Sequence, residues 1–160
     1  LRNAGFELPG STDAAARNWT SGSPDAFGGV WGNVSRETWR ARGGEWEAVI
    51  KGTWAGADYG GWWQEAAVTP GSNYQASAWL WADNDWSASL QELKIEFYRY
   101  GDCIATNRLP FSDVRQSWTQ KLLTATAPAG ATAAHLVIQA SGAGVPGALQ
   151  IDEVDFRLAP

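Results

Sequence analysis

The stretch QEAAVTPGSNYQASAWLW, residues 64–81, decides the fold of this chain. Apolar and polar residues alternate through residues 64–69, stop at Pro70-Gly71, and alternate again through residues 74–81. A period of two is typical of a strand with one buried face, and Pro-Gly is typical of a turn. The stretch therefore predicts two strands joined by a turn. The expected inward residues are Gln64, Ala66, Val68, Tyr74, Ala76, Ala78 and Leu80.

The same alternation occurs elsewhere in the chain. It runs through residues 46–51, 136–140 and 149–158, and it predicts a strand in each. Residues 93–98 also fit a helical spacing, but their β-branched and aromatic content favours a strand. Residues 125–134 are rich in Ala and Thr, and their Pro and Gly indicate a loop.

About eight short strands separated by turns predict an all-β fold, a two-sheet β-sandwich of the jelly-roll type. The chain has 160 residues, of which 44% are hydrophobic. That is enough for one core, and no internal boundary or repeat divides the sequence. We therefore expect a single domain over residues 1–160, present as a monomer.

The charge and the cysteine content exclude several classes of protein. A net charge of −5 opposes binding to nucleic acid or to an anionic membrane, and no apolar run has the length of a membrane span. The chain starts at Leu1 without a signal peptide, as we expect of a processed product or a fragment of a longer protein. Cys103 is the single cysteine, so it can form neither an internal disulfide nor a cysteine-based zinc site.

The sequence contains little that indicates catalysis. His135 is the single histidine, it stands beside an apolar run, and no nucleophile motif accompanies it, so we expect it to be structural. Motifs for zinc hydrolysis, phosphate binding and dinucleotide binding are absent. A pair of carboxylates at glycosidase spacing remains possible among the 17 acidic residues, which leaves a small glycosidase or lyase open.

The tryptophan content points to binding instead. The chain has 11 Trp, more than a core about 10 Å thick between two sheets readily holds. Surface indoles with little charge around them suit a neutral sugar, because a pyranose has an apolar C–H face and a rim of hydroxyls. Stacking contributes about 1 kcal/mol per ring beyond the area that it buries, so several sugar units would be needed for useful affinity.

Four segments together resemble the jelly-roll carbohydrate-binding modules of the xylan- and β-glucan-binding, galactose-binding-like superfamily. They are residues 3–7 (NAGFE), residues 44–52 (GEWEAVIKG), residues 64–71 with Tyr74, and residues 151–154 (IDEV). This resemblance covers nearly the whole chain. It implies a non-catalytic module that attaches a secreted glycan-active enzyme to its polysaccharide, with a covalently linked catalytic domain elsewhere in the full-length protein.

The resemblance also implies a structural calcium ion that ties the first strand to the last. Its ligands would be the side chains of Glu7 and Asp152 and a backbone carbonyl near Glu45. Oxygen ligands of this kind suit Ca²⁺. The alternative is that these carboxylates are ordinary surface groups.

Modules of this kind bind glycans across a sheet face or at the loop edge, and the sequence leaves both open. By strand parity Trp63, Trp79, Trp81 and Tyr98 lie opposite the core, whereas residues 54–63 and Trp86 lie in expected loops. A β-sandwich spacer that binds no sugar is the remaining alternative. The candidate carbohydrate-binding residues are Trp54, Tyr59, Trp62, Trp63, Trp81, Trp86 and Tyr98, with Glu96 and Gln139 as hydrogen-bonding groups.

Overall fold

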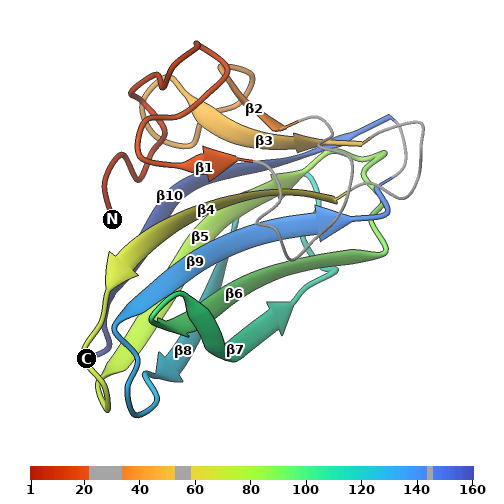
Figure 1. Cartoon of the computed structure of the whole chain (residues 1–160). Helices are drawn as coiled ribbons and strands as arrows, with labels where there is room; N and C mark the ends of the chain where they lie inside the picture. The colour runs from red at the N-terminus through yellow and green to blue at the C-terminus, as the bar shows by residue number, and fades with distance from the viewer. Residues whose placement is uncertain (22–33, 53–58, 144–145) are drawn as a thin grey trace.

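A computed structural model describes residues 1–21, 34–52, 59–143 and 146–160, without the side chain of Tyr59. Within these ranges ten strands form two five-stranded antiparallel sheets and no helix occurs (Figure 1). The strands are β1 (Thr20–Ser21), β2 (Val34–Glu37), β3 (Glu47–Lys51), β4 (Tyr59–Ala67), β5 (Asn73–Ala82), β6 (Leu90–Arg99), β7 (Asp102–Pro110), β8 (Thr119–Thr126), β9 (Ala133–Ser141) and β10 (Ala148–Leu158).

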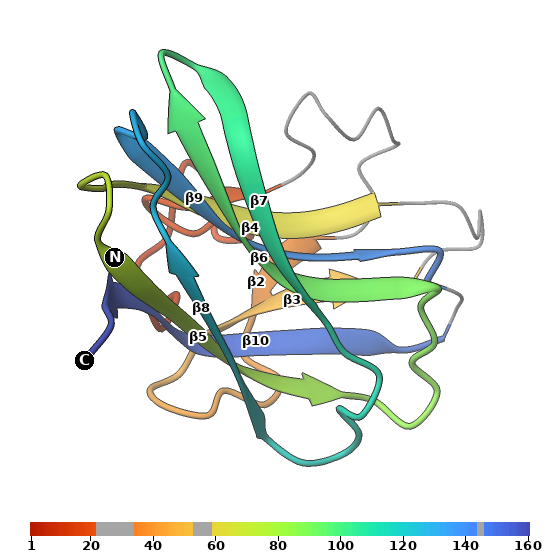
Figure 2. The same cartoon turned by 90° about the horizontal axis from the view of Figure 1, so that it is seen from below.

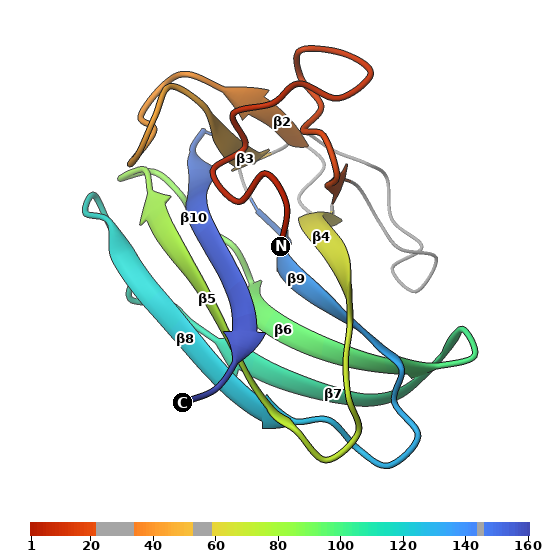
Figure 3. The same ribbon diagram turned by 90° about the vertical axis from the view of Figure 1, so that its left-hand side faces the viewer.

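The two sheets lie face to face as the layers of a sandwich (Figure 3). The first sheet has the order β1-β4-β9-β6-β7, and the second has the order β2-β3-β10-β5-β8. In Figure 2 the hairpin of β6 and β7 projects beyond its neighbours at the edge of the first sheet. The predicted all-β jelly-roll sandwich is confirmed. The described residues contain no helix that is long and apolar enough to cross a membrane.

The core forms between the inner faces of the two sheets, as the alternation predicted. Leu93, Ile95 and Phe97 of β6 are fully buried, so residues 93–98 form a strand and not a helix. The small residues Ala76 and Ala78 of β5 lie in the same buried cluster as large aromatic side chains from elsewhere in the chain. A core that combines small and large side chains can fill the space between sheets at normal density.

Trp62 is one of the two largest buried side chains among the described residues, with Trp86. Its ring is fully buried, packs edge-on against Phe6 at 5.8 Å between ring centroids, and donates from Nε1 to the carbonyl of Val49 at 3.3 Å. Phe6 also contacts Trp19, at 4.8 Å. The indole thus fills the core from the first sheet and satisfies its own donor.

The strand prediction differs from the structure in several places. β1 and β2 were not expected, because two and four residues are too short to show an alternation. β7 and β8 were not expected either, because they are edge strands whose side chains are mostly exposed or half-buried and carry little apolar pattern. The expected loop over residues 125–134 is shorter than predicted. Its first two residues belong to β8 and its last two to β9, because the Ala and Thr there pair with β5, β4 and β6.

Candidate functional site

Three rings form a stacked row across the outer face of the first sheet. Trp63 of β4 stacks on His135 of β9, with 4.2 Å between ring centroids and 23° between planes. His135 meets Tyr98 of β6 on its other side, at 4.1 Å. The row arises because β4, β9 and β6 are neighbours and all three residues point outward. Trp63 and Tyr98, at the two ends, are partly exposed.

Two carboxylates lie beside this row in a buried network. Glu96 accepts hydrogen bonds from Lys94 at 2.5 Å and from the Tyr98 hydroxyl at 3.0 Å. Burial and the negative charge of Glu96 raise the pKa of Tyr98, so the phenol stays protonated and donates. Glu92 accepts from Arg108 at 2.7 Å and from Gln139 at 2.6 Å. Each carboxylate thus has a cation and a neutral donor, which offsets its desolvation.

The burial of this network is unusual for the outer face of a sheet. Glu92 and Lys94 are each 1% exposed and Gln139 is 4% exposed. Among the described residues six buried polar atoms have no hydrogen-bond partner, and three of them lie on this face: Nε1 of Trp63, Nδ1 of His135 and Oε1 of Gln139. Buried polar atoms normally have partners, so each exception calls for an explanation. The row of rings beside the buried charges makes this face the candidate functional site.

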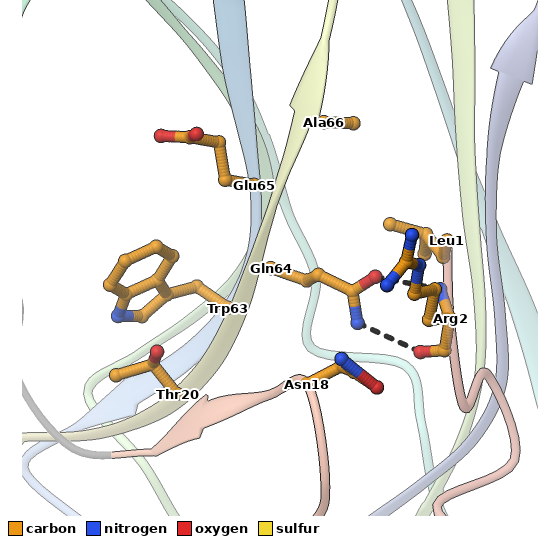
Figure 4. Close-up of a pocket in the computed structure, with 8 residues that line it drawn as sticks. All are labelled: Leu1, Arg2, Asn18, Thr20, Trp63, Gln64, Glu65 and Ala66. Carbon is orange, nitrogen blue, oxygen red and sulfur yellow. Dashed lines mark hydrogen bonds between the residues drawn. The ribbon is translucent and has the colours of Figure 1, made fainter.

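A pocket of about 610 Å³ opens at the edge of the same sheet, beside Trp63. Among the described residues, β1 pairs with β4 at two positions, Thr20 with Trp63 and Ser21 with Trp62. Figure 4 shows Trp63, Glu65 and Thr20 on one side of β4, and Gln64 with Arg2 on the other. The complete lining is Leu1, Arg2, Asn18, Thr20, Trp63, Gln64, Glu65 and Ala66.

One end of the pocket is held by a double hydrogen bond. The side-chain amide of Gln64 accepts from the backbone N–H of Arg2 at 2.7 Å and donates to its carbonyl at 2.9 Å. On the outer side, Glu65 contacts Nε2 of His135 at 3.2 Å. The pocket is therefore lined by the ring of Trp63 and by two polar side chains with fixed partners, Gln64 on Arg2 and Glu65 on His135.

The structure brings together four of the predicted binding residues. Trp63, Tyr98, Glu96 and Gln139 all lie on the outer face of the first sheet. Trp54 lies outside the described residues, and so does the side chain of Tyr59.

Trp62 and Trp86 are buried, so the expectation that they present rings to a sugar is wrong. Residues 59–63 were expected in a loop, but β4 begins at Tyr59 and includes them. The alternation along the strand then turns Trp62 inward. Trp86 does lie in a loop, but its Nε1 donates to Gln91 at 2.9 Å inside the protein and the ring is 2% exposed.

Trp81 lies on the opposite side of the molecule, on the outer face of the second sheet. It meets Trp118 edge-on at 6.2 Å, and Arg40 lies over its ring at 4.4 Å. The neighbouring Trp79 is covered by Arg42 at 3.7 Å. Guanidinium groups thus occupy ring faces on this side.

The tryptophans divide between core and surface. Of the nine that the structure describes, Trp19, Trp62 and Trp86 are buried and the other six are at least partly exposed. Trp19 lies in the core, whereas Trp46 and Trp118 are only half-buried.

The residues named as calcium ligands also converge. Glu7 accepts from the backbone N–H groups of Glu45 and Trp46 at 3.1 to 3.2 Å. Asp152 accepts from the backbone N–H groups of Arg42 and Gly43 at 2.7 and 2.9 Å. A bulge in β10 follows Asp152 and aims it at this loop.

The charges of Glu7 and Asp152 suit a cation between them, but the two side chains alone are too few ligands for Ca²⁺. Burial, together with the charge of Glu7, raises the pKa of Asp152 to about 6, although the loop N–H groups lower it. A cation between the two carboxylates would relieve their repulsion. The carboxylates give two ligands, the side chain of Glu45 is exposed, and backbone oxygens would have to supply the rest. Across the described ranges no group of three or more His, Cys, Asp or Glu side chains could hold a metal.

Several residues of the site were missed by sequence reasoning. Lys94, Glu92 and Arg108 look like ordinary charges on the solvent side of strands. The burial of Lys94 and Glu92 has no local signal. His135 was expected to be structural, and the structure shows it on the outer face between two rings. The positions of Glu92 and Lys94 opposite the core residues of β6 were available from parity, but the partners of Glu92 come from β7 and β9.

Comparison with known proteins gives a fold and no family. No family model matches the sequence, and no curated protein matches it. Among solved structures, the enzymatically active domain of tailspike protein 4 of bacteriophage CBA120 matches with a TM-score of 0.75 and 16% identity. That match covers 99% of this chain and 21% of the tailspike chain, so this chain spans about a fifth of that protein.

Two further matches have nearly the length of this chain. The module TmCBM61, solved with β-1,4-galactotriose, matches with a TM-score of 0.60 and 14% identity over 99% of this chain and 97% of its own. A cyclase from Fischerella sp. TAU, solved with an indolyl butanone, matches with a TM-score of 0.64 and 15% identity over 100% and 96%. A family 16 carbohydrate-binding module matches as well. At these identities the likeness shows the fold, which is the jelly-roll sandwich of carbohydrate-binding modules and of some enzymes.

Proposed function

We propose that this chain is a non-catalytic carbohydrate-binding module that attaches a secreted glycan-active enzyme to its polysaccharide. The observation that carries the proposal is the row Trp63, His135 and Tyr98, which lies beside fixed hydrogen-bonding groups on one outer face. The fold likeness to two carbohydrate-binding modules supports it. The match to one fifth of a tailspike chain supports a role as one part of a larger protein.

The chemistry of the face suits an uncharged sugar. A half-exposed indole supplies the apolar platform, and carboxylate, amide and hydroxyl groups supply partners for sugar hydroxyls. The carboxylates Glu92 and Glu96 are each paired with a cation, so the network does not present a strong field to the ligand. Galactose-, xylose- and glucose-based polymers are therefore the first to test.

Affinity electrophoresis tests this function and this site together. The native chain would be run in gels containing xylan, β-glucan, β-1,4-galactan, mannan, pectin or alginate, beside three variants. Retardation should be lost in Trp63→Ala and kept in Trp39→Ala, because Trp39 is an exposed indole outside this face. Loss in Trp81→Ala instead would move the site to the second sheet. No retardation in any gel would favour a spacer domain that binds no sugar.

A small enzyme on the same face is the second candidate. The full-length likeness to a cyclase favours it, and so does the buried carboxylate of Glu96, which is held by Lys94 and Tyr98. Buried carboxylates with fixed partners are common among catalytic acids. Release of reducing ends or of unsaturated products from any of the six polymers, abolished in Glu96→Gln, would establish this function in place of the first.

We also propose that Ca²⁺ binds between Glu7 and Asp152 and ties the N-terminal segment to β10. A ligand that binds only the folded state raises the melting temperature in proportion to the logarithm of its concentration. Calcium should therefore raise the melting temperature of the native chain above its value in EDTA, and Asp152→Asn should remove the difference. Asp113→Asn, at a more exposed carboxylate, is the matched control. Equal melting temperatures with calcium and with EDTA in the native chain would contradict the proposal.

A further inference from the structure

We propose a second binding site, on the outer face of the second sheet, that takes the carboxylate of a uronate unit in an acidic polysaccharide. The site is centred on Arg40 and Trp81. It lies across the sandwich from Trp63, because β5 and β4 belong to different sheets. The inference goes beyond the proposed function, so either can fail while the other holds.

A row of indoles runs along the outer side of β5. Trp79 and Trp81 alternate with the buried residues Ala78 and Leu80, so both point outward, about 7 Å apart along the strand. Trp118, just before β8, meets Trp81 edge-on, with 6.2 Å between ring centroids and 61° between planes. Trp81 and Trp118 thus form an apolar corner, and both rings are partly exposed.

The loop between β2 and β3 places two guanidinium groups on this row. The guanidinium carbon of Arg40 lies 4.4 Å from the ring centroid of Trp81, and that of Arg42 lies 3.7 Å from that of Trp79. The two arginines are two residues apart in the loop, as the two indoles are on β5. Each ring therefore holds one guanidinium in place.

The buried carboxylates beneath this loop bind its backbone. Glu47 accepts from the backbone N–H of Arg40 at 3.1 Å, and Asp152 accepts from the backbone N–H of Arg42 at 2.7 Å. Both carboxylates are fully buried. They fix the position of the loop, and neither forms an ion pair with the guanidinium of Arg40.

Arg40 differs from most of the other cations that lie over rings. Those others have a second partner: Arg36 donates to two backbone carbonyls, Arg42 pairs with Glu153, Lys51 pairs with Glu37, and Lys121 pairs with Asp113. The exposed guanidinium of Arg40 has no ion pair and no hydrogen bond to any described residue. Arg99 shares this property over Tyr100, but no second ring stands beside that pair in the described chain.

A stacked guanidinium without a partner suits a carboxylate. Stacking uses the flat face of the group and leaves its N–H edge free, so Arg40 can donate two parallel hydrogen bonds to one carboxylate. The corner of Trp81 and Trp118 suits the C–H face of the sugar ring that carries this carboxylate. The exposed amide of Gln120, opposite Trp79 on β8, is a partner for sugar hydroxyls. An acidic peptide would use the guanidinium but not the apolar corner, so the features together favour a uronate.

The net charge of the chain limits how such a ligand binds. At −5 the chain repels a polyanion at long range, so affinity has to come from direct contact with Arg40 and the rings. Binding should therefore depend strongly on this one side chain. Because the contact is between opposite charges at the surface, it should also weaken as salt is added.

Isothermal titration with defined oligomers tests the site. The native chain would be titrated with tetramers of α-1,4-galacturonate, β-1,4-mannuronate and α-1,4-guluronate, in EDTA so that calcium cannot bridge carboxylates. At least one tetramer should bind. Its methyl ester keeps the sugar and removes the charge, and it should bind about tenfold more weakly or worse, which corresponds to a loss of about 1.4 kcal/mol.

Matched variants assign the binding to Arg40. Arg40→Gln should lower uronate affinity about tenfold or more. Arg40→Lys should not restore it, because an ammonium group offers no planar fork. Arg17→Gln makes the same change of charge at an exposed arginine of the N-terminal segment, and affinity should persist. The melting temperature of Arg40→Gln should fall by less than about 4 °C, because the lost contact is exposed.

Several results would overturn the inference. They are no binding of any of the three tetramers, full affinity in a folded Arg40→Gln variant, and equal binding of an oligoglutamate of the same charge, which would show a carboxylate site without a sugar preference. Trp63→Ala separates the two sites. It should keep uronate binding while it loses the neutral polymers, and loss of uronate binding in this variant would refute a second site.

Discussion

The adjacent residues Trp62 and Trp63 should respond to the same substitution in opposite ways. Trp62→Ala removes a fully buried indole, its edge contact with Phe6 and its hydrogen bond to the carbonyl of Val49. Truncation of a buried Trp to Ala typically costs about 3–5 kcal/mol. For a chain of this length each kcal/mol lowers the melting temperature by about 2–4 °C, so we expect a fall of roughly 6–20 °C.

Trp63→Ala removes a partly exposed ring whose main described contact is His135. Loss of an aromatic pair at such a position costs about 1 kcal/mol, so the melting temperature should fall by less than about 4 °C. Sugar affinity should fall about tenfold or more, because a loss of about 1.4 kcal/mol in binding corresponds to a factor of ten.

Calorimetry and oligosaccharide titration on both variants decide the matter. Trp62→Phe provides a milder core variant if Trp62→Ala does not fold, and it should bind sugar as the native chain does. Two results would refute the reasoning. The first is a Trp62→Ala variant whose free energy of unfolding lies within about 1 kcal/mol of the native value, which is the cost expected for losing a surface aromatic pair. The second is a Trp63→Ala variant that keeps full sugar affinity.

Two further predictions concern stability. Gly147→Ala should cost several kcal/mol, because its φ is +128° and a Cβ there would lie 2.7 to 2.9 Å from the backbone of Trp86 and its neighbour. Gly71 has a φ of +79°, but a Cβ there would have no atom within 4 Å, so Gly71→Ala should cost only about 1 kcal/mol of backbone strain. Equal urea midpoints for the two variants would contradict this account. Burial raises the pKa of Glu37, but hydrogen bonds from Lys51 and a neighbouring serine outweigh it, and the pKa lies below 4.5. Glu37→Gln should therefore be less stable than the native chain near pH 7, and the gap should narrow below about pH 4; a gap independent of pH would exclude this ion pair as its cause.

Substitutions in the buried ion pairs of the first sheet are expected to affect stability as well as binding. Removing one member of a buried ion pair leaves the other without compensation, at a typical cost of about 3–5 kcal/mol. Variants of Lys94 or Glu92 therefore confound binding with stability. Site tests are cleaner at Trp63, which lies at the margin of the network.

The sequence by itself determined six of the ten described strands, β3 to β6, β9 and β10, and the face on which most of their residues lie. A period of two is a local property of extended backbone, so Trp63 and Tyr98 could be assigned to the outer side from their neighbours alone. It could not show where β4 begins. The glycines around residue 60 looked like a loop, and this is why Trp62 was expected at the surface.

Only the tertiary structure decided which outward residues share a site. β5 belongs to the second sheet, so Trp81 lies across the sandwich from Trp63, although both point away from the core. His135 meets Trp63 and Tyr98 because β9 pairs between β4 and β6. Pairing of strands far apart in sequence depends on long-range packing, which alternation along one strand does not encode. The row of rings arises from that pairing.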